Sequence, residues 1–205
     1  MLFGRIVKAT ATTVAAAGLL LTAAAVSAQA DEASATAHVV KLSESAVTLL
    51  TDRQVDADDK AAALHKLFVE GFDIRTLSRA VLGRHWRKAD DAQRAAYVQA
   101  FEAYVVKTYV RRLSQLDEVS VKIKGARALS EKDSLVSTRF AGPNGQPLNI
   151  DWRVRERDGQ ARIIDVIIEG VSMAVTQRAE FSALIRSNGG KLDMLIVALE
   201  KKAAA

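Results

Sequence analysis

Few side chains in this sequence could carry out chemistry. The chain has three histidines, His38, His65 and His85, and no cysteine. No two histidines have the H-x-x-x-H or H-E-x-x-H spacing that places two ligands on one face of a helix, so no metal site is predicted. No serine stands in a G-x-S-x-G turn, although a Ser-His-Asp arrangement assembled by the fold stays open. No catalytic residue and no cofactor are therefore predicted.

Charged residues on the strands predicted at 148–155 and 162–169 form two patterns, a possible acid pair and a row of arginines. Asp151 and Asp165 fall on neighbouring predicted strands and could form an acid pair. Alternatively, each is solvated or paired with Arg153, Arg155 or Arg162. Period-two alternation also puts Arg153, Arg155 and Arg157 on one side of their strand, opposite Ile150, Trp152 and Val154. Arg153 and Arg155 are therefore candidate residues for docking a partner, or part of a solvated strand face.

The first thirty residues have the pattern of a secretory signal peptide. Arg5 and Lys8 precede an uncharged run, Ala9–Val26, and Ala28-Gln29-Ala30 supplies the small residues of a cleavage site. We expect residues 1–30 to be removed in the periplasm and residues 31–205 to form one domain. An uncleaved membrane anchor, and a second cleavage site at Val26-Ser27-Ala28, are the alternatives.

The overall charge excludes one class of function. The formal net charge is +5, it falls by two when Arg5 and Lys8 are removed, and basic and acidic residues alternate along the chain. A nucleic-acid-binding protein would need a concentrated basic stripe, so no nucleic acid is expected as a partner.

Apolar spacing predicts helices first, then strands, then helices. Asp31–Ala37 should be a frayed lead-in, and the helix that begins at Ala89-Asp90-Asp91 should be the longest, reaching about Leu116. Four strands with short connections should form an antiparallel meander. The expected elements are helices 39–50, 56–72, 74–82, 89–116, 172–187 and 192–199, and strands 119–124, 135–140, 148–155 and 162–169. This order predicts an α+β fold with helices against one face of a curved four-stranded antiparallel sheet.

The last strand is more apolar than a sheet with one solvated face requires. Alternation puts Ile164, Val166 and Ile168 on one face, and Ile163 and Ile167 beside Asp165 on the other. The surplus indicates either an ordinary core in both layers or a cavity, and periodicity alone does not separate them.

Two series of residues resemble the MlaC, or toluene-tolerance, family. The helical series is Phe72-Asp73-Ile74-x-x-Leu77, Ala80-Val81-Leu82-Gly83-x-x-Trp86 and Gln93-Arg94-x-x-Tyr97-x-x-x-Phe101. The second is Ile150-Asp151-Trp152-Arg153-Val154, Asp165-Val166-x-x-Glu169-Gly170-Val171-Ser172-Met173, Arg178-x-x-Phe181-x-x-x-Ile185 and Gly189-Gly190-x-x-Asp193-x-Leu195-Ile196. The resemblance covers about residues 72–199.

The resemblance implies a nuclear-transport-factor-two-like cone with extra N- and C-terminal helices and an apolar pocket between sheet and helices. It implies a periplasmic carrier, without a catalytic step, that shuttles phospholipid between an outer-membrane lipoprotein complex and an inner-membrane lipid ABC transporter complex. The residues expected to line the pocket are Tyr104, Val105, Trp152, Ile164, Val166, Ile168, Val171 and Met173.

Three other functions stay open. The cargo could be a hopanoid-type lipid, since related proteins are linked to hopanoid metabolism. An enzyme could use the same cone, with Asp165 or His85 as its acid or base. A protein-only adaptor would have a filled core instead of a cavity.

Overall fold

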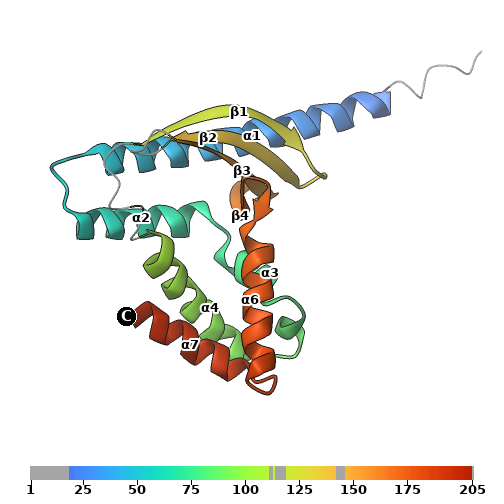
Figure 1. Cartoon of the computed structure of the whole chain (residues 1–205). Helices are drawn as coiled ribbons and strands as arrows, with labels where there is room; N and C mark the ends of the chain where they lie inside the picture. Colours follow the sequence, from blue (N-terminus) through green and yellow to red (C-terminus); the bar gives the residue numbers. More distant parts are fainter. Residues whose placement is uncertain (1–18, 111–112, 114–118, 142–145, 205) are drawn as a thin grey trace, which may run out of the picture.

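The chain folds in the predicted order of helices, strands and helices (Figure 1). The computed structural model describes residues 19–110, 113, 119–141 and 146–204. The elements are α1 (Leu19–Thr51), α2 (Ala57–Gly71), α3 (Ile74–Leu82), η1 (Gly83–Arg87), α4 (Asp91–Val105), η2 (Val106–Val110), β1 (Ser120–Ala128), β2 (Asp133–Ala141), β3 (Pro147–Arg157), β4 (Gln160–Ile168), β5 (Val171–Ser172), α6 (Met173–Ser187) and α7 (Leu192–Ala204).

Side-chain caps fix the helix boundaries near the predicted positions. Asp56 caps α2 and Asp73 caps α3, each by accepting backbone N–H groups of the first turn. Gly83 ends α3 with φ +59°, a left-handed conformation that glycine adopts without strain. Asp90 and Gln93 form a reciprocal capping box at the start of α4.

Two helix predictions are wrong in extent. The helix expected at 39–50 is part of α1, which has 33 residues and is the longest helix in the described ranges. The expected lead-in is helical, and Ala35 within it is buried against the sheet. The alanine-rich sequence explains this, because alanine has the highest helix propensity. The regular part of α4 ends at Val105 and passes into the π-helical turn η2, so the predicted helix is not regular throughout, and its expected end near Leu116 lies outside the described residues.

The sheet is antiparallel with strand order β1-β2-β3-β4-β5. The curved antiparallel architecture is confirmed, with the two-residue β5 as a fifth strand beside the four predicted ones. The first residue of the helix predicted at 172–187, Ser172, belongs to β5 and caps α6. The predicted turn at 142–145 lies outside the described residues.

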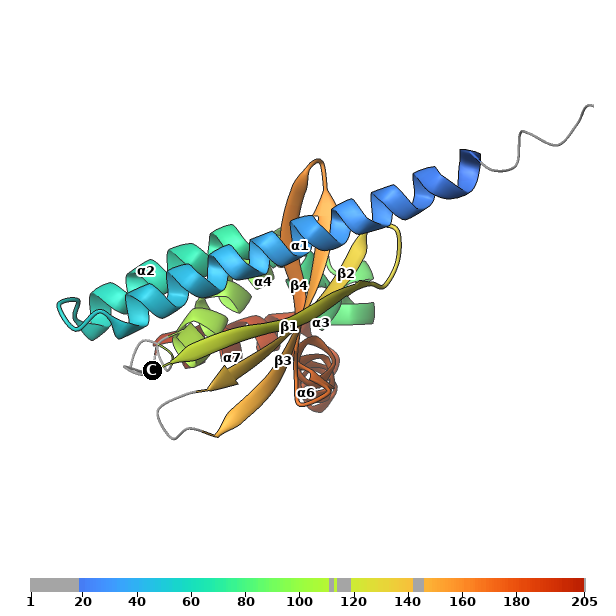
Figure 2. The same cartoon turned by 90° about the horizontal axis from the view of Figure 1, so that it is seen from above.

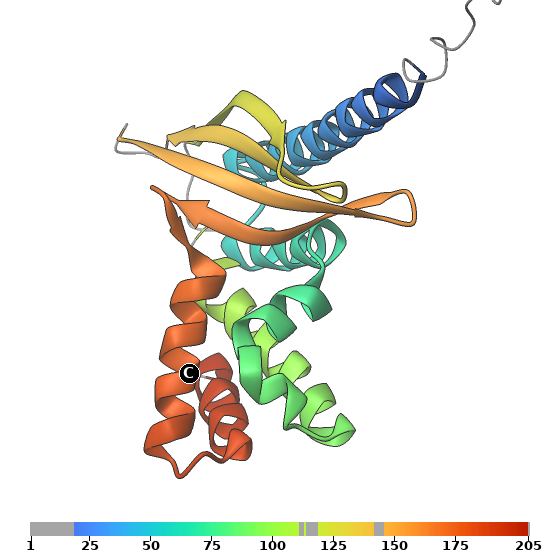
Figure 3. The same cartoon turned by 90° about the vertical axis from the view of Figure 1, so that its right-hand side faces the viewer.

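Of the three apolar clusters in the described residues, two define an upper and a lower part of the molecule, and the third packs the end of α1 against α2 and η2 (Figure 1). In the upper part α1 packs across the strands, with Ala35 and Val39 against Val136, Val154 and Ile163 (Figure 2). In the lower part α3, α4, α6 and α7 share a core and hang below the sheet (Figure 3). Three aromatic residues of α4, Tyr97, Phe101 and Tyr104, lie in that lower core and surround Phe181.

Backbone contacts join the two parts. Phe72 forms a parallel bridge with Ile163 of β4, and the N–H of Asp73 donates to the carbonyl of Ile163 at 3.0 Å. The start of α3 is therefore fixed to β4, which positions the lower helices relative to the sheet.

Candidate functional site

One face of the sheet is only partly covered by α1. Near the β1–β2 and β3–β4 connections, this face packs on α1 through Val136, Val154 and Ile163, all fully buried. Toward the other end, strand alternation and pairing register continue the same face with residues that are half-buried or exposed. We call this set the open apolar face: Val121, Ile123, Phe140, Leu148, Ile150, Trp152, Val166 and Ile168.

The open apolar face has a large exposed hydrophobic content. Leu148 is 41% exposed, and Ile123 is exposed as well. Ile150 pairs with Ile168 across β3 and β4, and Trp152 pairs with Val166. The other six residues of the face are half-buried, so the face is apolar and only partly covered by the described part of the chain.

A β-bulge changes which residues of β4 reach this face. Val154 pairs with Ile163 and Arg153 pairs with Asp165, so Ile164 is an extra residue without a partner in the ladder. Ile163 pairs with Val154 and lies on the same face as Val166 and Ile168, so the prediction that Ile163 lies on the opposite face is wrong. The sequence contains no signal for this bulge, because the irregularity is defined by the partner strand.

The eight residues predicted to line a pocket fall in different places. Trp152, Val166 and Ile168 lie together on the open apolar face. Val171, in β5, is 54% exposed beside Ile168, and Met173 begins α6. Tyr104 and Val105 belong to or pack against the lower helical core, and Ile164 is buried. The prediction omitted Leu148 and Ile150, although they alternate with Trp152 and Val154 on the same strand.

Two cavities in the described structure lie elsewhere. One, of about 580 Å³, is bounded by α2, α3, α4 and the β3–β4 hairpin, and the other, of about 420 Å³, is bounded by α2, α4, η2 and α7. None of the eight predicted residues lines either cavity.

Asp165 has a structural role at the start of α6. Its carboxylate accepts a hydrogen bond from the Ser172 hydroxyl at 2.5 Å and another from the Ala174 N–H at 3.1 Å. These bonds tie β4 to the first turn of α6. The acid pair with Asp151 is not among the hydrogen bonds of the described residues, so Asp165 does not have the arrangement of an acid–base dyad.

His85 is remote from Asp165. Burial, followed by the charges of Arg84, Lys88 and Arg186, lowers the pKa of His85 below its ordinary value. Arg186 ends α6, whereas Asp165 contacts Ala174 at its start, and twelve helical residues span about 18 Å. The two alternative candidates for an acid or base in an enzyme therefore lie at opposite ends of α6.

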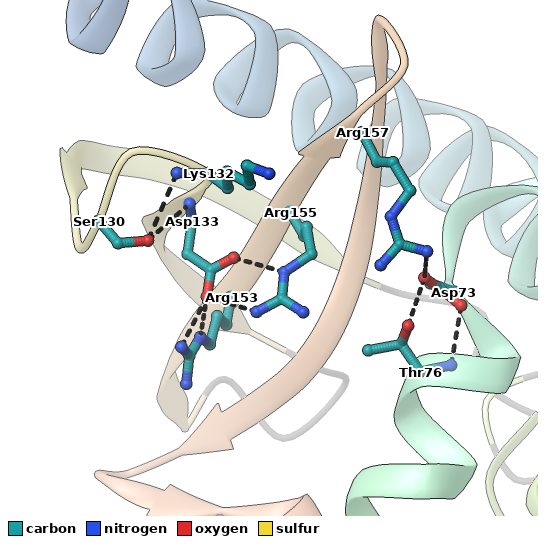
Figure 4. A network of polar contacts seen from close by, with 8 residues as sticks. All are labelled: Asp73, Thr76, Ser130, Lys132, Asp133, Arg153, Arg155 and Arg157. Atoms are coloured by element: carbon teal, nitrogen blue, oxygen red, sulfur yellow. Dashed lines mark hydrogen bonds and ion pairs between the residues drawn. The ribbon is translucent and has the colours of Figure 1, made fainter.

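Arg153 and Arg155 converge on one carboxylate (Figure 4). Asp133, 3% exposed, accepts from Nε and Nη2 of Arg153 at 3.0 and 2.6 Å and from the same atoms of Arg155 at 2.6 and 2.9 Å. The expected partners, Asp151 and Asp165, were wrong, because the β2–β3 register places Asp133 opposite Arg155. Burial raises the pKa of Asp133, but the hydrogen bonds and charges of the two guanidinium groups outweigh it and leave the pKa below its usual range.

The described ranges contain neither a metal-binding cluster nor a membrane-spanning helix. Within them, no three His, Asp or Glu side chains gather as metal ligands would. Among the described helices, none combines the length and apolar character needed to cross a bilayer.

Comparison with known proteins places the chain in a family. A toluene tolerance protein of Pseudomonas putida is 23% identical over 135 residues, which are 65% of this chain and 63% of that protein, so the match spans less than two thirds of the relative. A phospholipid-binding protein of Ralstonia solanacearum, solved in complex with a phospholipid, shares the fold with a TM-score of 0.73 at 23% identity, over 83% of this chain and 97% of that one. The family model described as "MlaC protein" matches residues 41–201, most of the chain. The predicted resemblance is thus confirmed, and the chain belongs to the MlaC family.

Proposed function

We propose that this protein is a periplasmic carrier of phospholipid, which binds acyl chains against the open apolar face and performs no catalytic step. The observation that carries the proposal is the face itself, where Leu148 is exposed and Ile150 and Ile168 are only half-buried at the end of a curved sheet. The fold shared with a phospholipid-binding protein supports it.

The energetics of lipid transfer explain why such a face is needed. Burial of each CH₂ group is worth about 0.8 kcal/mol, so two long acyl chains cost on the order of 20 kcal/mol to expose to water. A carrier must therefore cover the chains with apolar side chains, whereas the polar headgroup can stay in solvent. The open apolar face supplies one wall of such a site.

We assign the predicted pocket residues to parts of this site. Trp152, Val166 and Ile168 would contact acyl chains directly. Val171 and Met173 would form the rim where β4 turns into α6. Tyr104, Val105 and Ile164, which are packed more deeply, would support the walls.

The location and route of the carrier are part of the proposal. Removal of residues 1–30 would leave a chain whose first residues are attached to the fold, since Glu32 accepts from the Ala128 N–H at 2.7 Å and Ser34 donates to Glu156 at 2.9 Å. Released into the periplasm, the carrier would exchange lipid with an outer-membrane lipoprotein complex and an inner-membrane lipid ABC transporter complex.

Arg153 and Arg155 are the proposed docking residues. Their side chains keep 43% and 31% of their surface exposed although both bind Asp133, so they can present donors to an acidic partner. Charge at an interface mainly sets encounter rate and specificity. Arg153→Gln should slow lipid transfer at low salt while bound lipid is retained, and Arg186→Gln, on the exposed end of α6, is the control. Equal transfer rates for the two variants would remove Arg153 from the docking surface.

Lipid extraction is the direct test of the carrier function. Organic-solvent extracts of the purified protein, analysed by mass spectrometry, should contain phospholipid. A polycyclic lipid would instead identify a hopanoid carrier, and the absence of any lipid would contradict the carrier proposal.

A matched pair of variants locates the site. Leu148→Glu puts a charge on the open apolar face, and Met194→Glu puts the same charge on α7 at a position of equal exposure, 41% against 43%. The first variant should lose most of its lipid because a carboxylate beside an acyl chain is poorly solvated. Lipid loss in both variants, or in neither, would show that the open apolar face is not the acyl site.

A further inference from the structure

The cavity of about 580 Å³ is a second candidate binding site, distinct from the open apolar face. It lies between the end of α2, the start of α3, the middle of α4 and the β3–β4 hairpin. Phe72 of the cavity floor packs edge-on against Trp152 of the open apolar face, with ring centroids 6.4 Å apart, so the two sites adjoin. Arg157 lies five strand residues beyond Trp152, about 17 Å away. The floor of the cavity is apolar, formed by Phe72, Ile74 and Val98.

Four arginines line the cavity: Arg75, Arg155, Arg157 and Arg162. Arg155 binds Asp133 through Nε and Nη2, which fixes its guanidinium group and leaves Nη1 outside the hydrogen bonds to that carboxylate. Arg157 approaches Asp73 Oδ2 only to 3.9 Å, which is too long for a hydrogen bond (Figure 4). Arg157 is therefore held near Asp73 only by a long ion pair, and its guanidinium donors can also reach a ligand.

The carboxylates of the cavity are largely occupied by other groups. Asp73 accepts from the N–H and the hydroxyl of Thr76 at 2.8 and 2.6 Å, as the cap of α3. Glu102 binds His65 at 3.0 Å. The third acid, Asp158, stands on the exposed turn of the hairpin. The lining thus holds more guanidinium groups than carboxylates, and two of its three carboxylates already have partners.

We propose that this cavity binds a phosphate group, held by Arg157 and Arg75 with help from Arg155, while the apolar floor contacts the body attached to the phosphate. Guanidinium groups match phosphate oxygens in pairs of parallel hydrogen bonds, which an isolated ammonium cannot do. The phosphate could belong to a lipid headgroup or to a small soluble phosphate ester. This site does not depend on the proposed acyl site, because the two share no residue.

Binding to the delipidated full chain tests the site. Calorimetric titrations at low salt would use inorganic phosphate in one arm and dihexanoyl phosphatidic acid, below its micelle concentration, in the other. Binding of both identifies a general phosphate site, and binding of the short-chain lipid alone identifies a headgroup site that needs the apolar floor. Binding of neither at millimolar concentration overturns the proposal.

Variants assign the binding to the cavity. Arg157→Gln and, separately, Arg75→Gln should weaken binding about tenfold or more, the loss expected for a charge-assisted hydrogen bond. Arg139→Gln, an exposed arginine of β2 outside the cavity, is the control and should leave the affinity unchanged. If all three variants weaken binding alike, or none does, the phosphate does not bind in this cavity. Matching thermal melts of the apo variants exclude misfolding as the cause.

Discussion

Replacing Asp133 with asparagine keeps the shape of the side chain and removes its charge. The carboxylate accepts four hydrogen bonds from Arg153 and Arg155. The asparagine oxygen can keep about two of these bonds, while its NH₂ group faces a guanidinium donor. Hydrogen bonds to charged groups contribute about 1.5–3 kcal/mol each to stability. Because both guanidinium groups are partly exposed and can turn to water, the lower end applies, and the expected loss is about 2–3 kcal/mol.

The loss should depend on pH with a defined sign. The pKa of Asp133 is lowered in the folded state, so its stabilising contribution is complete above the unfolded pKa of about 3.9 and disappears as the pH falls through the folded pKa. The free energies of unfolding of the wild type and Asp133→Asn, measured by urea denaturation of delipidated protein, should differ most at pH 7, and the difference should shrink as the pH falls below about 4.

A second Asp→Asn change provides the control. Asp158 stands on an exposed turn with φ +53°, a conformation that asparagine tolerates, so its replacement should change stability by less than about 0.5 kcal/mol. A difference below about 0.5 kcal/mol for Asp133→Asn, or a difference that stays constant from pH 7 to pH 3, would refute the role assigned to the Asp133 carboxylate.

Three further predictions concern the N-terminus, a helix end and the apolar face. Exported protein should begin at Asp31 on N-terminal sequencing, and a start at Met1 in the membrane fraction would contradict cleavage. Gly83→Ala should lower stability by about 1–2 kcal/mol in thermal melts, since its φ is +59° and a Cβ would lie 3.1 Å from Arg178, whereas Gly189→Ala, with φ +69° and open space, should cost less. Val166→Trp should overpack the cluster beneath α1 and lower the stability of the delipidated protein by about 1–3 kcal/mol. The same variant, purified with its lipid, should contain less lipid than the wild type. Unchanged lipid stoichiometry would remove Val166 from the acyl site.

The helix boundaries could be predicted because their signals are local. Asp56, Asp73 and Asp90 cap the helices that follow them, and each cap depends on neighbours within three residues. The extension of α1 was missed because a signal-like run of alanine and leucine also favours helix. The sequence has no local property that limits α1 to the segment after Asp31.

The site could be predicted only in part, because its parts depend on pairing. Trp152 and Val166 follow from strand alternation, and they do lie opposite each other. The extra residue at Ile164 and the partnership of Asp133 with Arg155 are set by the register between strands, which no single segment encodes. Tyr104 contacts Phe181 in the lower core, and tertiary packing, not the local sequence, decides which face of α4 is buried there.

The bulges of β1 and β4 make the curvature of the sheet adjustable by chain length. Lys124 in β1 and Ile164 in β4 are each one residue more than the neighbouring strand requires, and bulges of this kind bend and twist a strand. Deleting Lys124 would leave every other pair of the β1–β2 ladder intact while straightening its outer strand. The number of residues in β1 and β4 thus sets the curvature of the sheet and the width of the surface that a ligand can contact. A relative with one residue more or fewer at these points would have a differently curved sheet, which would fit a ligand of another size.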